Sequence, residues 1–168
     1  VNEYAVGGHN TTDTLGVAPT VISDYAGYES RTIVILHIGG NNISSSGPYP
    51  GGKDTLDSEF RQIISELNSA GFIVFPSSIT YRVPPGSNPS APYNQLCVIP
   101  AISELTPHAL RISGRPIIDL YKHTSITSDI HSSDGVHYNS DGYESLAGYI
   151  GFAISDALEN TAATSEFI

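Results

Sequence analysis

The stretch that decides the fold of this chain is Ile33-Val34-Ile35-Leu36-His37-Ile38-Gly39-Gly40-Asn41-Asn42. Its apolar, largely β-branched part predicts a strand over residues 32–38 that is buried on both faces, as strands of parallel sheets are. The two glycines then let the backbone turn tightly where the strand ends. Ligands bind at this carboxyl end in open α/β sheets, and an Asn amide there can donate to a developing oxyanion. Taken alone, the segment is better explained by an ordinary Gly-Gly-Asn-Asn turn.

Outward from this strand, strand and helix patterns alternate along the chain. Strand patterns cover residues 3–6, 72–75 and 116–121, and helical patterns cover 11–25 (interrupted by Pro19), 55–69, about 93–110 (broken by Pro100 and Pro107) and 140–158. The last helix is expected to bury one face made of Tyr143, Leu146, Ala147, Ile150 and Ile154. The alternation predicts a three-layer α/β/α fold with a central parallel sheet. We expect one domain over residues 1–158 and a frayed polar tail over 159–168.

Asp134-Gly135-Val136-His137 places a carboxylate three residues before a histidine, just ahead of the last helical pattern. A short loop can hold both groups at the rim of a sheet. The histidine can then act as general base to a nucleophile while the carboxylate fixes its tautomer. The pattern is weak by itself, because the chain has six histidines.

A similar strand end occurs near the start, in Asn2-Glu3-Tyr4-Ala5-Val6-Gly7-Gly8-His9-Asn10-Thr11-Thr12. A short apolar run leads to paired glycines and then to Asn and Thr residues suited to capping a helix. A backbone N–H exposed at such a glycine would be a second oxyanion donor.

In this order and spacing, the three segments resemble the blocks that define the SGNH (GDSL-type) hydrolase family. The resemblance places the oxyanion-hole glycine at Gly8, the oxyanion-hole asparagine at Asn41, the orienting carboxylate at Asp134 and the base at His137. The family usually has an aspartate after the asparagine, and this chain has Asn42 there. That departure removes a charge.

The resemblance implies a flavodoxin-like α/β/α fold and a serine esterase or deacylase that needs no metal and no organic cofactor. In the implied mechanism a serine attacks the ester carbonyl, His137 transfers its proton and Asp134 orients the imidazole. The resemblance implies that the substrate is an acylated small molecule or carbohydrate. We favour O-acetyl groups on carbohydrate, because the loops are rich in Gly, Ser, Pro and Asn and show no large apolar lid.

The nucleophile block is missing, since no Gly-Asp-Ser occurs in the chain. Three explanations fit: an upstream peptide or another chain carries the nucleophile strand, the chain is a non-catalytic relative, or another serine has replaced it. We expect the first, with residues 3–6 and 32–38 flanking a strand that this sequence does not contain. The alternative function is an inactive carbohydrate-binding or structural module of a larger surface or particle protein.

Ser77 and Ser78 lie in Val74-Phe75-Pro76-Ser77-Ser78-Ile79-Thr80, which superficially resembles a nucleophile block. The segment follows a helix and the strand over 72–75, so it fits a later strand end instead. We therefore do not assign the nucleophile to it.

Composition excludes several partners. The net charge is −10 with only seven Lys and Arg, which argues against nucleic acid and anionic membranes. Such acidity favours a secreted or particle-associated protein without identifying a partner. No apolar run approaches the roughly 18 residues of a membrane span, and the single Cys97 cannot form an internal disulfide.

Other residues have weaker claims. His9 and Arg82 are candidate substrate contacts, and the loop over residues 81–93 would lie at the active rim. His37 is expected to be a partly buried neighbour of the site. Asp129, Asp134, His123 and His131 lack a metal-ligand spacing, so no metal site is expected.

Overall fold

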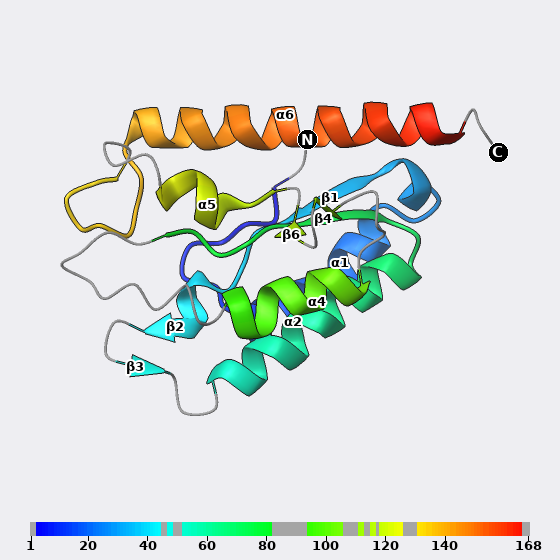
Figure 1. Ribbon diagram of the computed structural model, residues 1–168. Coiled ribbons are helices and arrows are strands. Elements are labelled where there is room, and N and C mark those ends of the chain that lie inside the picture. Colours follow the sequence, from blue (N-terminus) through cyan, green and yellow to red (C-terminus); the bar gives the residue numbers. More distant parts are fainter. Residues whose placement is uncertain are drawn as a thin grey trace.

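The computed structural model describes residues 3–44, 47–48, 52–81, 94–105, 111–112, 115–116, 118–125 and 131–165 (Figure 1). Its centre is a parallel pair of strands, β1 (Ile33–Leu36) and β4 (Ile73–Pro76), in which Ile33 lies opposite Ile73. A parallel bridge between Ser77 and Ile118 continues the sheet on the far side of β4. The described strands therefore run in the order β1, β4, Ile118.

Helices cover both faces of this sheet. On one face lie α1 (Thr11–Asp24), α2 (Gly52–Ser69) and α4 (Ile99–Leu105), which continues the π-helical turn η3 (Asn94–Val98). The long helix α6 (Ser140–Ser165) covers the other face (Figure 1). The remaining elements are η1 (Glu29–Arg31), η2 (Gly40–Asn42), β2 (Ile43–Ser44), β3 (Gly47–Pro48), β5 (Arg111–Ile112), β6 (Arg115–Pro116) and α5 (Leu120–Ser125). The predicted α/β class with a parallel sheet is confirmed.

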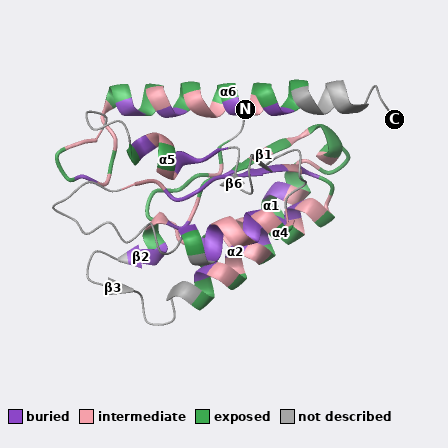
Figure 2. Ribbon diagram, viewed as in Figure 1, coloured by how far each residue is buried: buried purple, intermediate pink, exposed green. Residues whose placement is uncertain are grey.

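Each face of the sheet has its own core, because successive strand residues point to opposite sides. Val74 belongs to the cluster with α1, α2 and α4, whereas its neighbour Phe75 belongs to the cluster with Ile118 and α6. Both are at most 3% exposed, so β4 is buried on both faces (Figure 2). This is the burial expected of an inner strand in a parallel sheet.

The helix predicted over residues 55–69 is confirmed as α2. Its carboxyl end has the hydrogen bonds of a Schellman motif: Phe72 N–H donates to Leu67 O at 3.1 Å and Gly71 N–H donates to Asn68 O at 3.0 Å. Gly71 has a φ of 97°, which a residue with a side chain rarely adopts. The motif leads the chain directly into β4.

Helix α1 begins with a capping box. The Asn10 side chain accepts from Asp13 N–H, and the Asp13 side chain accepts from Asn10 N–H. The expectation that Pro19 interrupts this helix is wrong, since Pro19 lies inside the continuous helix.

Five further expectations need correction. Residues 3–6 have no strand hydrogen bonding, and the strand expected over 116–121 is reduced to β6 and the bridge at Ile118 before α5 begins at Leu120. Pro100 does not break the helical segment there, because it lies within α4. Helix α6 continues through residues 159–165, which were expected to fray. On α6, Tyr143 and Ala147 are exposed, and Tyr149, Ala153 and Ala157 join the packed face instead.

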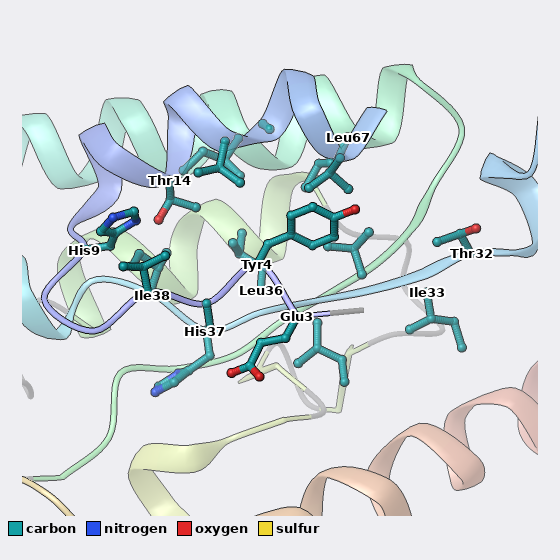
Figure 3. A pocket seen from close by; sticks show the side chains of 18 of the residues that line it. Glu3, Tyr4, His9, Thr14, Thr32, Ile33, Leu36, His37, Ile38 and Leu67 are labelled. Carbon is teal, nitrogen blue, oxygen red and sulfur yellow. The ribbon is translucent and has the colours of Figure 1, made fainter. Parts of the chain in front are cut away.

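Residues 3–6 and β1 do not pair with each other; an open cavity of about 370 Å³ is lined by both. We call this cavity the β1 groove. Its walls are residues 3–6, residues 32–38, and the side chains of Val17, Ala18 and Val21 on α1 (Figure 3). The lining is mainly apolar, and in Figure 3 Tyr4 lies between α1 and β1.

Candidate active site

Asp134 and His137 lie in a loop closed by an antiparallel bridge between His131 and Tyr138. Within it, Ser132 N–H donates to His137 O at 2.9 Å and Gly135 N–H donates to Ser132 O at 3.0 Å. Gly135 has a φ of 68°, so the tight turn uses the left-handed region that favours glycine. The local sequence thus fixes a small loop that precedes α6.

Asp134 is held by four hydrogen bonds, three of them to Oδ1. Its Oδ1 accepts from Val136 N–H at 2.8 Å, His137 N–H at 2.9 Å and the Ser132 hydroxyl at 2.9 Å. Its Oδ2 lies 2.6 Å from Nδ1 of His137. These hydrogen bonds, that from the His137 side chain first, hold the pKa of Asp134 well below its usual range.

This pair fixes the state of the imidazole. An ionised carboxylate can only accept, so Nδ1 of neutral His137 carries the proton and Nε2 presents a lone pair. The side chain of His137 is 71% exposed, and among the described residues none forms a hydrogen bond to its Nε2. Such an imidazole can take a proton from a hydroxyl that approaches from outside the loop.

The two glycine-ended turns also contact each other. Nδ2 of Asn41 donates to the backbone carbonyl of His9 at 2.9 Å, which uses one of the two amide hydrogens. Gly8 is exposed with a φ of 87°. The structure therefore brings the candidate donors Gly8 and Asn41 into adjacent turns. No described residue other than His9 accepts from the Asn41 amide, so its second hydrogen is available to an oxyanion as far as the described chain shows.

Asn42 has a structural role that the sequence did not reveal. Its Oδ1 accepts from Thr11 N–H at 3.1 Å, and its Nδ2 donates to Thr11 Oγ1 at 2.7 Å. The Thr11 hydroxyl in turn donates to the carboxylate of Glu59 on α2. Because that hydroxyl has one hydrogen, residue 42 must supply a donor, which an ionised aspartate cannot do. This network explains Asn42 at the position where the family usually has Asp.

The turn at Asn41 and the Asp134–His137 loop lie at the same edge of the sheet. Asn41 follows β1, and Nε2 of His131 lies 3.3 Å from the carbonyl of Tyr81, which follows β4. In Figure 1 both strands run toward the end of the molecule from which α6 starts. Parallel strands present their carboxyl ends at one edge, where ligands bind in such sheets.

Ser77 forms a second serine–histidine contact, with its Oγ 2.8 Å from Nδ1 of His37. Ser77 is completely buried, so no substrate reaches its hydroxyl. Desolvation of its ring lowers the pKa of His37 and makes it a weaker base. The rest of this side chain is exposed and borders the β1 groove. The contact supports a structural role for Ser77 and His37 at the end of β4.

Ser78 is also buried, and its hydroxyl donates to Asp119 at 2.8 Å. His9 lines the β1 groove, whereas Arg82 lies outside the described residues. Within the described part of the chain, no group of three His, Cys, Asp or Glu residues could hold a metal ion. Ser132 was missed by the sequence analysis; its only signal is its position two residues before Asp134.

Comparison with known proteins assigns the family. The model of the GDSL-like lipase/acylhydrolase family matches residues 1–150, so the chain belongs to this family of ester-hydrolysing enzymes. No curated protein matches the chain significantly. Among the described helices, none combines the length and apolar character needed to span a membrane.

Proposed function

We propose that this chain is the acid–base part of a serine ester hydrolase whose nucleophilic serine comes from a segment outside the printed sequence. His137 takes the proton of that serine and returns it to the leaving alcohol. Asp134 orients His137 and stabilises the imidazolium that forms. Asn41 and the N–H of Gly8 bind the oxyanion of the tetrahedral intermediate.

The observation that carries this proposal is the Asp134–His137 pair. The 2.6 Å contact fixes one tautomer, and the exposed Nε2 is open to an incoming hydroxyl. Three donors to the other oxygen of Asp134 keep the carboxylate ionised and in place.

We further propose O-acetyl groups on carbohydrate as the substrate class. The exposed residues Gly8, Asn41 and His137 and the half-buried His9 are polar or small and suit a hydrated ligand. The alternative is a longer acyl chain, which would suit the mainly apolar lining of the β1 groove. Comparing p-nitrophenyl acetate and p-nitrophenyl decanoate would separate these substrates, since a short-chain deacetylase favours the acetate.

The test is loss of activity on removal of the base. In a preparation that contains the serine segment, His137→Ala should reduce kcat on p-nitrophenyl acetate about as much as removal of the serine, by roughly 10⁶-fold, because such residues act as a unit. The printed chain alone should show no burst of p-nitrophenol. His123→Gln is the matched control, because His123 contacts Ser145 on α6 outside the loop. Full activity of His137→Ala, or activity that disappears with Ser77→Ala, would contradict the proposal.

A further inference from the structure

The loop that carries Asp134 and His137 is tied to the sheet at its first residue, His131. The ring Nε2 of His131 lies 3.3 Å from the backbone carbonyl of Tyr81, in the segment that follows β4. A carbonyl oxygen can only accept, so Nε2 carries a hydrogen and donates it to Tyr81 O. This hydrogen bond joins the Asp134–His137 loop to the carboxyl edge of the sheet.

The accepting end of this bond is itself held in place by α5. Tyr81 N–H donates to Oγ1 of Thr124 at 2.9 Å, and that hydroxyl donates to the carbonyl of Leu120 at 2.7 Å. The Tyr81 ring packs edge-on against the ring of Tyr121, with 5.7 Å between the ring centroids. Thr124 is only 1% exposed, so this attachment lies inside the fold. The carbonyl of Tyr81 is therefore a fixed acceptor.

The donating end is coupled to the acid–base pair through its neighbours in the loop. His131 forms an antiparallel bridge with Tyr138, the residue after His137, and the two rings lie 5.0 Å apart. Ser132, the residue after His131, donates through its N–H to His137 O at 2.9 Å and through its hydroxyl to Asp134 at 2.9 Å. A shift of His131 would therefore move both members of the pair.

The second ring nitrogen of His131 has no comparable contact. Its Nδ1 is buried, and no residue in the described part of the chain forms a hydrogen bond to it. A buried polar atom without a partner lowers stability, and such losses are expected at functional sites. A phenylalanine would pack against Tyr138 without this loss. Packing alone therefore does not explain an imidazole here, whereas the hydrogen bond to Tyr81 does.

The proposed chemistry needs the loop to be fixed relative to the rest of the site. His137 lies on the loop, whereas the oxyanion donors Asn41 and Gly8 lie on turns that belong to other parts of the chain. The base and the oxyanion donors must act on one substrate at the same time. A misplacement of about 1 Å can lower a rate by about 100-fold.

We propose that His131 is a positioning residue, whose Nε2–H bond to Tyr81 O fixes the Asp134–His137 loop against the edge of the sheet that carries Asn41. His131 does not touch the substrate and acts through His137. Its effect on catalysis rests on the proposed function, whereas the anchoring of the loop rests on the contacts of His131 alone.

Two substitutions separate the donor from the ring. His131→Phe keeps an aromatic ring against Tyr138 and removes the donor, whereas His131→Gln keeps an N–H donor that can reach Tyr81 O. The measurement is the NMR order parameter of the amides of residues 132–137 in the full printed chain. We expect values of about 0.85 in the native chain and in His131→Gln, and values below about 0.6 in His131→Phe.

The matched control for the anchor is His123→Phe. His123 contacts Ser145 at 3.0 Å and stacks on Tyr149, so this change also removes a ring nitrogen that contacts α6. It should leave the order parameters of residues 132–137 unchanged. Unchanged order in His131→Phe, or an equal loss in the His123→Phe control, overturns the proposal.

Kinetics test the link to catalysis. In a preparation that contains the serine segment, His131→Phe should lower kcat on p-nitrophenyl acetate by about 10–100-fold with KM unchanged, because a misplaced base acts on the transition state. His131→Gln should restore most of the activity. The Tm of His131→Phe should stay close to the native value, since removal of the buried Nδ1 offsets the lost hydrogen bond. A kcat loss in His131→Phe that follows a large fall in Tm would indicate a merely structural residue and overturn the proposal.

Anchoring and catalysis fail separately in this design. A native preparation without hydrolysis rejects the proposed function, and the order parameters then decide alone whether His131 anchors the loop. Loss of loop order in His131→Phe with an unchanged kcat overturns the positioning role while the proposed function stands.

Discussion

At the scale of single residues, the sequence predicted that Asp134 and His137 share a loop, and the structure places them in contact. It could not predict Ser132, because a serine near a loop aspartate carries no distinctive pattern. The structural role of Asn42 was also not predictable. Asn42 donates to the Thr11 hydroxyl, and that hydroxyl donates to Glu59, which lies far away in the sequence. The catalytic roles of Gly8, Asn41, Asp134 and His137 stay predictions.

The first prediction at this scale concerns the charge of Asp134. The hydrogen bonds to Asp134 lower its pKa in the folded protein. They therefore stabilise the loop fully at any pH above the ordinary Asp pKa of about 3.9, and this stabilisation is lost as the pH falls through the lower pKa of the folded state. In a carbon NMR titration, the Asp134 carboxyl signal should stay constant from pH 7 down to about 4. A midpoint at or above the ordinary value would contradict the hydrogen-bonded loop.

Replacing this carboxylate should also affect catalysis. Asp134→Asn leaves the size of the side chain unchanged but no longer selects the tautomer with a proton on Nδ1. In the presence of the serine segment, kcat should fall by about 10⁴-fold, the loss measured for the equivalent change in a serine protease. Ser132→Ala, which removes one of the three donors to Oδ1, should have a much smaller effect.

The prediction for the oxyanion hole concerns Asn41. Asn41→Ala should lower kcat by about 10²–10³-fold with little change in KM, because the donor acts mainly on the transition state. The control is the stability of the variant, since Asn41 also donates to His9 O and its loss could loosen the turn. A rise in KM alone would make Asn41 a substrate contact.

At the scale of secondary-structure elements, prediction succeeded where a segment specifies itself. Helix α2 has apolar residues at helical spacing and a glycine at its end, and β4 is an apolar run bounded by turn residues. Prediction failed for residues 3–6 and 116–121, which have strand composition but depend on a neighbouring strand for their hydrogen bonds. Pro19 was wrongly expected to interrupt α1. The helix continues because its packing on α2 outweighs the one backbone hydrogen bond that proline cannot make.

The element-scale prediction concerns the junction of α1 and α2. Asn42→Asp should destabilise the protein by about 1–3 kcal/mol, because it removes the donor to the buried Thr11 hydroxyl and adds a charge near Glu59. Asn41→Asp, at an exposed neighbouring position, is the matched control and should cost much less. Thermal unfolding measures both, and combining Asn42→Asp with Glu59→Gln should recover much of the loss. Equal stability of Asn42→Asp and the native protein would contradict the network.

At the scale of the whole molecule, the packed part of the fold is asymmetric. Strand β4 is buried on both faces, whereas β1 has an open edge and two exposed isoleucines beside the β1 groove. The sequence predicted a gap between residues 3–6 and β1, because the family resemblance implies a nucleophile strand there that this sequence does not contain. The size and lining of this gap could not be predicted from the sequence, since they depend on how α1 packs against the sheet.

The last prediction follows from this asymmetry. A ligand that binds only the folded chain stabilises it by about 2.7 kcal/mol at 100 times Kd. For a protein of this size, that corresponds to a rise in Tm of roughly 5–11 °C. A synthetic peptide that supplies a strand, Val-Ile-Val-Ile-Gly-Asp-Ala, should produce such a rise in the native chain. It should produce none in Ile35→Pro, which lacks a backbone donor on the edge of β1 that faces away from β4. A control peptide of the same length, in which two of the four Val and Ile residues are replaced by proline, should have no effect, because it cannot pair along β1. Equal shifts with both peptides would mean that apolar contact alone drives binding, and the open edge of β1 would then have no part in completing the sheet.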